Sequence, residues 1–378
     1  MAPVLETLAA LVRINSVNPS YAGGQPEAAI AAWITDFYRA RGIPAFEQEV
    51  FPGRPNLIAR LEGQDPSRRI VMEAHMDTAS VAGMSIPPFE PTVSGGRMYG
   101  RGTCDTKAGL AAMMHALVRV KEEGVTPPCE IWVVAAADEE FSYRGVVRLC
   151  EGLQADAGVV SEPTDMRAVI ATKGCVRWRI LTRGKAAHSS KPHLGVNAIE
   201  HMARVIARLA EDSRGLAERS HPLVGPPTLN IGLIRGGVQV NFVPDACVIE
   251  LDRRLIPGEE VSSVLASYQV VLDELKAECP EIDVVMEPPM IEDIPLETTA
   301  SSRVVEVASS VLKDLGRNSA PEGVPYGSDA SKLSRARIPS IVIGPGSIDQ
   351  AHAAVEFVEC GQVELAEEFY YRFMLSFH

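Results

Sequence analysis

The chain has 378 residues, of which 46% are hydrophobic and 22% are charged. This length exceeds what one simple core supports, so two domains are the default expectation. A formal net charge of −13 argues against a nucleic acid or an anionic membrane surface as partner. No apolar stretch has membrane-spanning length, and the opening MAPVLETLAALVRINS predicts an amphipathic helix rather than a signal peptide.

The seven cysteines are scattered without the C-x-x-C spacing of metal or redox motifs. An odd number of dispersed cysteines is typical of a protein that keeps its thiols reduced, with most of them acting as small core residues. With neither a signal peptide nor a membrane span in the pattern, we expect a cytoplasmic protein.

The first half of the chain alternates strand patterns with helix patterns. After the opening helix, a second one begins near Pro26 and ends before Gly42, and a third covers about 107–123. Strands are predicted at 45–51, 55–61, 69–74, 131–137 and 158–160. The glycine pair 95–96 predicts a hairpin, and Gly100-Arg101-Gly102 predicts a tight turn. This alternation favours an α/β sheet covered on both faces.

Acidic and histidine side chains follow the predicted strands at the point where each strand ends. His75 follows the strand at 69–74, Glu139-Glu140 follow the run at 131–137, and Glu162 follows the strand at 158–160. Open α/β sheets bind ligands at the carboxyl ends of their strands. One such acid is most simply a solvated loop residue or a helix cap, but a series of them indicates a site.

The pattern changes after Lys173-Gly174 into an α+β unit of about a hundred residues, the size of an inserted domain. Its predicted elements are strands at 176–181, 228–234 and 246–255 and helices at 196–209 and 260–277. The α/β pattern then returns with a helix at 299–314, a strand at 340–343 and a terminal helix. We predict a first domain formed by 1–174 and 290–378, interrupted by a second domain at 175–289.

His75-x-Asp77 places two side chains on the same side of an extended backbone. A metal-binding imidazole usually donates its second N–H to a carboxylate, and Asp77 has the spacing for that role. The motif alone is common. Glu139-Glu140 is more informative, because adjacent side chains point apart, one towards a metal and one towards a substrate water. The alternative for this pair is a solvated acidic turn.

Nine segments occur in a fixed order along nearly the whole chain. They are EAHMDT (73–78), GRGTCDTKAG (100–109), ADEE (137–140), SEPTD (161–165), KAAHSSKPHLGVNAI (185–199), NFVPD (241–245), LDRRLIPGE (251–259), YGSDA (326–330) and AH (351–352). Together they resemble the M20 metallopeptidase family, in particular its acetylornithine deacetylase and succinyl-diaminopimelate desuccinylase branch. GRGTCD followed by T-K-x-G, and SEPTD, are the most specific of them.

The resemblance implies a mixed sheet flanked by helices, as in di-zinc peptidases, with an inserted ferredoxin-like α+β domain that forms a dimer. It also implies two divalent metal ions, zinc or alternatively cobalt, with Asp105 as the shared ligand. The implied ligands are His75, Asp105 and Glu162 for one ion, and His352, Asp105 and Glu140 for the other. The bond between Asp105 and Thr106 is expected to be cis.

The resemblance further implies that Glu139 is the general base and proton donor, that Asp77 supports His75, and that His188 stabilises the oxyanion across a dimer interface. As a lone residue in a polar loop, His188 would instead be a surface histidine. The implied substrate-binding residues are Asn241, Arg254 and Ser328. One departure is Val355, where relatives often carry Asn or Asp, so a hydrogen-bonding side chain is missing beside one metal.

These features predict a metal-dependent amidohydrolase that removes an acetyl or succinyl group from an amino acid by means of a metal-activated water. A dipeptidase or carboxypeptidase of the same family is the alternative, with a small N-acyl amino acid or a dipeptide as substrate. A non-catalytic metal-binding relative is disfavoured because Glu139 and all five ligands are present. A nucleotide-binding α/β protein ranks last, because no G-x-G-x-x-G opens a helix after a strand.

Overall fold

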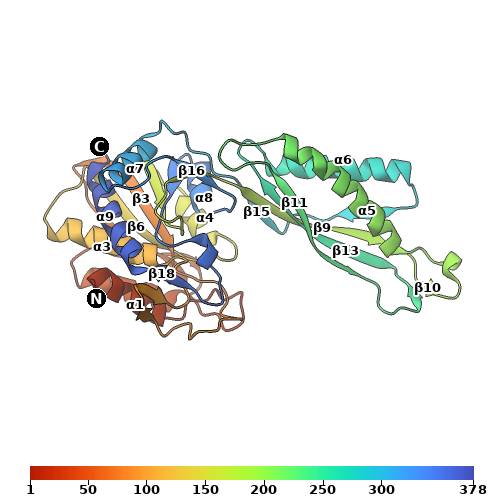
Figure 1. The fold of residues 1–378 in the computed structure, drawn as a ribbon, viewed down its shortest axis with the longest axis horizontal. Helices are drawn as coiled ribbons and strands as arrows, with labels where there is room; N and C mark the ends of the chain where they lie inside the picture. Colours follow the sequence, from red (N-terminus) through yellow and green to blue (C-terminus); the bar gives the residue numbers. More distant parts are fainter. The chain divides into compact units, whose positions relative to one another are not determined.

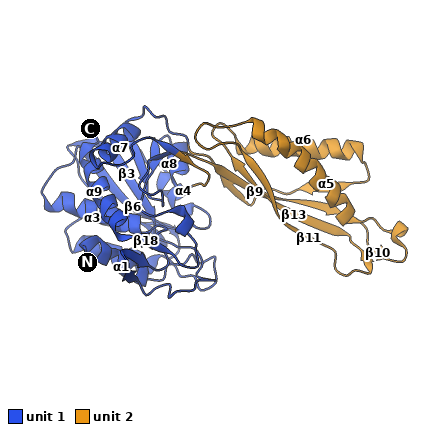
Figure 2. Cartoon of the chain, viewed as in Figure 1, with its two compact units in different colours: residues 1–170, 297–322, 328–378 blue, residues 171–296, 323–327 orange.

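A computed structural model describes residues 1–378, and its internal contacts divide the chain into two units (Figure 2). Unit 1 comprises 1–170, 297–322 and 328–378, and unit 2 comprises 171–296 with 323–327. The sequence patterns placed the second domain at 175–289. Its start is therefore a few residues later, and its end a few residues earlier, than those of the segment 171–296. The patterns gave no sign that the short segment 323–327 belongs with unit 2.

The main sheet lies mostly in unit 1 and is mixed, as the family resemblance implied (Figure 1). It has eight strands. In sheet order the strands are β1 (Ala45–Phe51), β2 (Arg54–Leu61), β6 (Cys129–Ala136), β3 (Asp65–His75), β7 (Ala157–Val160), β17 (Ser340–Val342), β8 (Val169–Thr172) and β16 (Glu322–Val324). The central strands β6, β3, β7 and β17 are parallel to one another, whereas β1, β2 and β8 pair in antiparallel fashion.

Strand β6 shows why the central strands form. All its residues except Trp132 are buried, which explains its continuous apolar run between two covered faces. It pairs with β3 in parallel, with His75 opposite Ala136. The carboxyl ends of β3 and β6 therefore lie at the same edge of the sheet, and the chain beyond each of them begins there.

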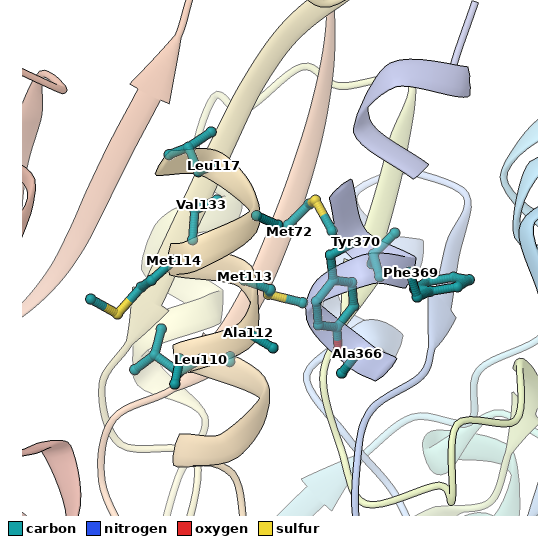
Figure 3. Close-up of a cluster of buried hydrophobic side chains, with 14 of the residues drawn as sticks. Met72, Leu110, Ala112, Met113, Met114, Leu117, Val133, Ala366, Phe369 and Tyr370 are labelled. Atoms are coloured by element: carbon teal, nitrogen blue, oxygen red, sulfur yellow. The ribbon is translucent and has the colours of Figure 1, made fainter. Parts of the chain in front are cut away.

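Helices cover the sheet of unit 1. They are α1 (Pro3–Arg13), α2 (Ala28–Arg39), α3 (Lys107–Glu122), α4 (Arg144–Cys150), α7 (Arg303–Asp314), α8 (Ala330–Arg335) and α9 (Cys360–Ser376). Figure 3 shows side chains of α3 and α9 packed with Met72 of β3 and Val133 of β6. Met113 and Tyr370 are both fully buried there, so the end of the chain belongs to the main core.

A three-stranded sheet connects the last part of unit 1 to an early hairpin. Its strands are β4 (Thr92–Ser94), β5 (Arg97–Tyr99) and β18 (Phe357–Glu359). The β4–β5 turn has Gly95 at φ 58° and Gly96 at φ 80°, conformations that favour glycine and confirm the predicted hairpin. Pairing of β18 with β5 holds the segment that carries His352.

Unit 2 is an α+β unit with its own core. Its sheet contains β11 (Thr228–Gly236), β13 (Ala246–Leu255), β9 (Gly174–Arg183), β14 (Asp283–Met286) and β15 (Ile291–Asp293), and a small ribbon joins β10 (Ala187–His188) to β12 (Phe242–Val243). Figure 1 shows α5 (Ala198–Asp212) and α6 (Val261–Glu278) along this sheet. Asn197 caps α5 by accepting the backbone N–H groups of Ile199 and Glu200. None of the helices of either unit has the length and apolarity needed to span a membrane.

Candidate metal centre

Three neighbouring strands carry the first candidate residues. In the order β6, β3, β7, these strands end next to Glu139-Glu140, His75 and Glu162 respectively. Each of the three strands is buried at this end, and His75 and Glu162 are only 2% and 6% exposed. Parallel strands with a common edge thus bring together residues that are far apart in the sequence.

Asp105 comes from the loop between β5 and α3. The predicted tight turn is present, with Gly102 at φ 82°, and a Cβ there would lie 2.8 Å from a methyl carbon of Thr78. Only glycine fits that position without displacing a neighbour. The peptide bond between Asp105 and Thr106 is cis, as the family resemblance predicted. Helix α3 then begins at Lys107.

His352 lies in the segment between η3 (Ile348–Gln350) and β18, with φ at 59°. Its Nε2 atom lies 3.0 Å from Oε2 of Glu140 and 3.3 Å from Oδ2 of Asp105. The side chain is 58% exposed, in contrast to His75. Contacts with these two carboxylates raise the pKa of His352 to about 10 in the protein without metal.

The structure assembles two groups of potential ligands that have Asp105 in common. His75, Asp105 and Glu162 form one, and Asp105, Glu140 and His352 form the other, with the ligand atoms of each group within 4.8 Å of one another. Asp105 directs Oδ1 towards His75 at 3.1 Å and Oδ2 towards His352. These are the same residues that the family resemblance assigned to the two metal ions.

The donor set fits two divalent cations. Asp105, Glu139 and Glu140 make ion pairs with His75 and His352 and with no lysine or arginine. An imidazole that binds a metal ion is neutral, so bound dications would supply the positive charge that these carboxylates then need. Carboxylate oxygens and imidazole nitrogens are common ligands of zinc and similar metals.

Glu139 stands beside both groups and belongs to neither. Its Oε2 atom lies 3.9 Å from Nε2 of His75, and its side chain is 14% exposed. Burial raises the pKa of Glu139 well above its usual range, and the nearby carboxylate of Glu162 raises it further. A carboxylate near the ligands but outside them is free to accept and release a proton.

Asp77 has contacts that differ from the predicted ones. The Nδ1 atom of His75 is 2.9 Å from the backbone carbonyl of Asp77 but 3.7 Å from its carboxylate. An N–H donated to this carbonyl leaves Nε2 of His75 available as a ligand atom. The carboxylate instead accepts the backbone N–H groups of Glu139 and Glu140, at 3.1 and 3.2 Å. Asp77 therefore links the backbone of Glu139 and Glu140 to the end of β3, where His75 lies.

Glu356 lies behind the ligand groups and had no predicted role. It is fully buried, pairs with Arg101 at 2.7 Å, and accepts the backbone N–H groups of Cys104 and Asp105 at 2.8 and 3.1 Å. It thereby ties the Asp105 loop to the segment of His352. Val355, the departure from the family pattern, is 39% exposed, so its neighbour rather than Val355 itself faces the interior.

The remaining predicted residues fall in different places. Ser328 belongs to unit 1 and is fully buried, and its hydroxyl has no hydrogen-bond partner. His188, Asn241 and Arg254 lie in unit 2, whereas both ligand groups lie in unit 1. His188 is exposed, with Nδ1 2.8 Å from the hydroxyl of Ser190. Arg254 donates to Asp252 at 2.9 Å, and the backbone carbonyl of Asn241 accepts the N–H of Ser189.

A cluster of two imidazoles and several buried carboxylates, with one carboxylate shared and one left over, is typical of two-metal hydrolases. The family model described as peptidase family M20/M25/M40 matches residues 71–376, and the chain belongs to this family of metal-dependent hydrolases. The predicted family is thus confirmed.

The chain is 31% identical over 367 residues to an acetylornithine deacetylase of Vibrio campbellii, covering 94% of this chain and 92% of that protein. Among solved structures it is similar to a tripeptidase from Staphylococcus aureus, with a TM-score of 0.80, 24% identity, and coverage of 98% and 96% of the two chains. It is also similar to a dinuclear metal-binding peptidase from Bacillus subtilis, with a TM-score of 0.75, 14% identity and coverage of 98% and 96%. These two structures support the fold.

Proposed function

We propose that this protein is a two-metal amidohydrolase that removes an acetyl or succinyl group from the nitrogen of an amino acid. The observation that carries the proposal is the pair of ligand groups sharing Asp105, with the separate carboxylate of Glu139 beside them. The 31% identity to an acetylornithine deacetylase over nearly the whole chain supports an acyl amino acid as substrate. We propose zinc as the native metal, with cobalt as an alternative.

His75, Glu162, Glu140 and His352 would hold the two ions together with the shared Asp105. Bound metal ions polarise an amide carbonyl and lower the pKa of water, which supplies a nucleophile at neutral pH. Glu139 accepts the proton of the attacking water and later donates a proton to the leaving amine. Its place beside both ligand groups, but outside them, suits both tasks, because a catalytic acid–base must reach the reacting proton without being held by a metal.

Three residues are proposed to recognise the substrate. The guanidinium of Arg254 offers two parallel N–H groups to the carboxylate of an amino acid, and Asn241 offers a further polar group. The proposal for Ser328 requires its buried hydroxyl to become accessible when substrate binds. Arg254 is partly exposed and holds Asp252, a contact that a substrate carboxylate would replace. His188 is proposed to donate to the oxyanion that forms from the carbonyl oxygen.

The second candidate is a peptidase that acts on short peptides. The named structures include a tripeptidase, and an amide between two amino acids needs the same base and the same ligands. Only the residues around the acyl side would differ. A non-catalytic relative is disfavoured by the retained Glu139.

A hydrolysis screen tests the proposal. The purified protein is stripped with a chelator, reloaded with Zn²⁺ or Co²⁺, and given N-acetyl, N-succinyl and N-formyl amino acids and a set of dipeptides and tripeptides. Release of acetate or succinate that requires added metal is the expected result. Cleavage of peptides alone would establish the second candidate, and no hydrolysis by protein holding two ions would overturn both.

We also propose a homodimer formed through unit 2. Its β11 strand pairs on one side only, with β13, and carries the exposed apolar side chains of Leu233 and Ile234, 46% and 55% exposed. Such an edge is a surface that another strand can cover. Sedimentation across working concentrations should give a dimer, and a fully active monomer would contradict both the dimer and a role of His188 in the partner's site. A cytoplasmic location stays a prediction.

A further inference from the structure

The segment between α1 and α2 runs alongside the end of β3. The N–H of Thr78 donates to the carbonyl of Ser16, and the N–H of Asn18 donates to the carbonyl of Thr78, both at 2.9 Å. The hydroxyl of Tyr21 donates to the backbone carbonyl of Glu140 at 2.8 Å. This segment therefore contacts two of the stretches that carry proposed metal ligands, although it contributes no ligand itself.

Asn18 is the residue of this segment that lies deepest. Its side chain is fully buried, and one amide nitrogen donates to two carboxylates, to Asp77 at 2.8 Å and to Asp138 at 3.0 Å. Its amide oxygen accepts the N–H of Ser20 at 3.0 Å. Because the amide offers two N–H groups and both are used, its orientation is set: a flipped amide would direct oxygen at two carboxylates.

Asp77 and Asp138 both contact or adjoin Glu139, the proposed general base. Asp77 accepts the backbone N–H groups of Glu139 and Glu140, as described above, and Asp138 immediately precedes Glu139 in the chain. Asp138 has φ at 67°, a conformation that a residue with a side chain adopts only when its surroundings hold it. Asn18 therefore bonds to Asp138 at the start of this loop and to Asp77, which accepts two backbone N–H groups of the loop.

Charge explains why an amide is needed at this position. Asp77 and Asp138 are both buried, at 0% and 1% exposure, and Arg54 forms an ion pair with Asp138. Arg54 donates to Asp138 at 2.7 Å but also forms a two-bond pair with the buried Glu27. One guanidinium thus serves two carboxylates. Asn18 lies between the two carboxylates and donates one hydrogen bond to each. These bonds reduce the cost of burying two negative charges close together.

We propose that Asn18 is a positioning residue that holds the loop of Glu139 and Glu140 in its working geometry, supported by Arg54, which donates to the same Oδ1 atom of Asp138. This role rests on the proposed function of Glu139 as general base. Asn18 contacts neither the ligand atoms nor the reacting groups, so it acts through Asp77 and Asp138. Removing such a contact typically lowers activity about 10- to 100-fold.

The test compares Asn18→Asp and Asn18→Ala with the wild type, all loaded with Zn²⁺. Asn18→Asp keeps the shape but exchanges the two N–H donors for an acceptor with negative charge. Asn318→Ala is the matched control, because Asn318 is exposed and donates only to Glu322. Bound metal per chain is measured for every variant, so that a change in the loop is separated from a loss of ions.

Two measurements decide the outcome. Amide hydrogen exchange of a peptide covering 137–143 should become at least about tenfold faster in both Asn18 variants, because the N–H groups bound to Asp77 are released. With the best substrate of the hydrolysis screen, kcat should fall about 10- to 100-fold while KM stays within about twofold. The Asn318→Ala protein should match the wild type in both.

Unchanged exchange in this peptide overturns the proposal, whatever the activity. Faster exchange with unchanged kcat overturns it as well, because the contact would then be structural only. Full turnover by Glu139→Gln would instead refute the proposed base and leave the exchange result standing. If neither Asn18 variant folds, Arg54→Lys, which keeps the charge but loses the two-bond fork, is measured in the same way and decides the question.

Discussion

The carboxylate of Glu356 accepts a hydrogen bond from the backbone N–H of Asp105, with 3.1 Å between nitrogen and oxygen. Some 250 residues separate the two in the sequence. The second oxygen of Glu356 pairs with Arg101, and both of these side chains are almost fully buried. The shared ligand of the two proposed metal ions is thus held by a charge that is itself shielded from water.

Glu356→Ala should destabilise the protein by about 3–5 kcal/mol, because it leaves the guanidinium of Arg101 buried without its partner. The urea midpoint of unfolding measures this loss. Glu359→Ala is the matched control, since its pair with Arg97 has a similar distance of 2.7 Å but is more than 40% exposed on both sides. That variant should lose less than about 1 kcal/mol. Equal losses in the two variants would contradict the role given to burial.

Glu139→Gln should lower kcat about 10²- to 10⁴-fold, because the amide cannot accept the proton of the attacking water. Both metal ions should remain, since Glu139 belongs to neither ligand group. Steady-state kinetics and metal analysis of the same sample measure the two effects. Glu122→Gln, at an exposed position near the end of α3, is the control and should keep wild-type turnover. Loss of an ion from Glu139→Gln would contradict the proposed role as base and indicate that Glu139 is a metal ligand.

Asp105→Ala should lose both metal ions after dialysis, whereas Glu162→Gln and His352→Ala should each retain about one ion per chain. The reason is that Asp105 belongs to both groups and the other two residues to one each. Elemental analysis of the dialysed proteins gives the stoichiometry. Retention of one ion by the Asp105 variant would show that the two groups do not depend on a common ligand.

His115 should make the stability of the protein sensitive to mild acid. Burial, with a contribution from Arg41, lowers the pKa of His115 to about 4. The unfolded chain therefore binds more protons than the folded one between about pH 6.5 and 4, and the stability is lost as the pH falls through that window. His115→Gln keeps a polar partner for Thr7 and should be less sensitive than the wild type.

Urea midpoints at pH 7, 5.5 and 4.5, taken in the presence of a chelator, measure this difference. The stability of the wild type relative to His115→Gln should fall from the highest pH to the lowest. His378→Gln, at the exposed end of the chain, is the control and should follow the wild type. A constant difference between His115→Gln and the wild type would refute the assignment.

The features that the sequence predicted best are those set by burial on two faces. The apolar runs that became β6 and β7 are buried on both faces, so they are continuous and their ends are plain in the sequence. Because parallel strands end at one edge, the grouping of His75, Glu139 and Glu162 followed from those ends. Short elements such as β16 and α8 have too few residues to display a period, and they were missed.

The polar contacts behind the ligands could not be predicted in this way. Asn18 and Arg54 look like an ordinary turn residue and an ordinary surface charge in the sequence, and only the fold places them against Asp138. Asp77 was predicted to use its carboxylate on His75, but its backbone carbonyl makes that contact. A spacing of two residues does not distinguish a side-chain acceptor from a main-chain one.

Asp105 gives each ligand group one of its two oxygens, and this has a thermodynamic consequence. An ion bound at one group draws electron density from the carboxylate that the other group needs, and like charges a few ångströms apart repel. Binding of the first ion should therefore weaken binding of the second, and by reciprocity the factor is the same whichever group fills first. A protein purified with a single ion per chain would then be a stable, half-loaded form. The second ion would bind only at a higher metal concentration.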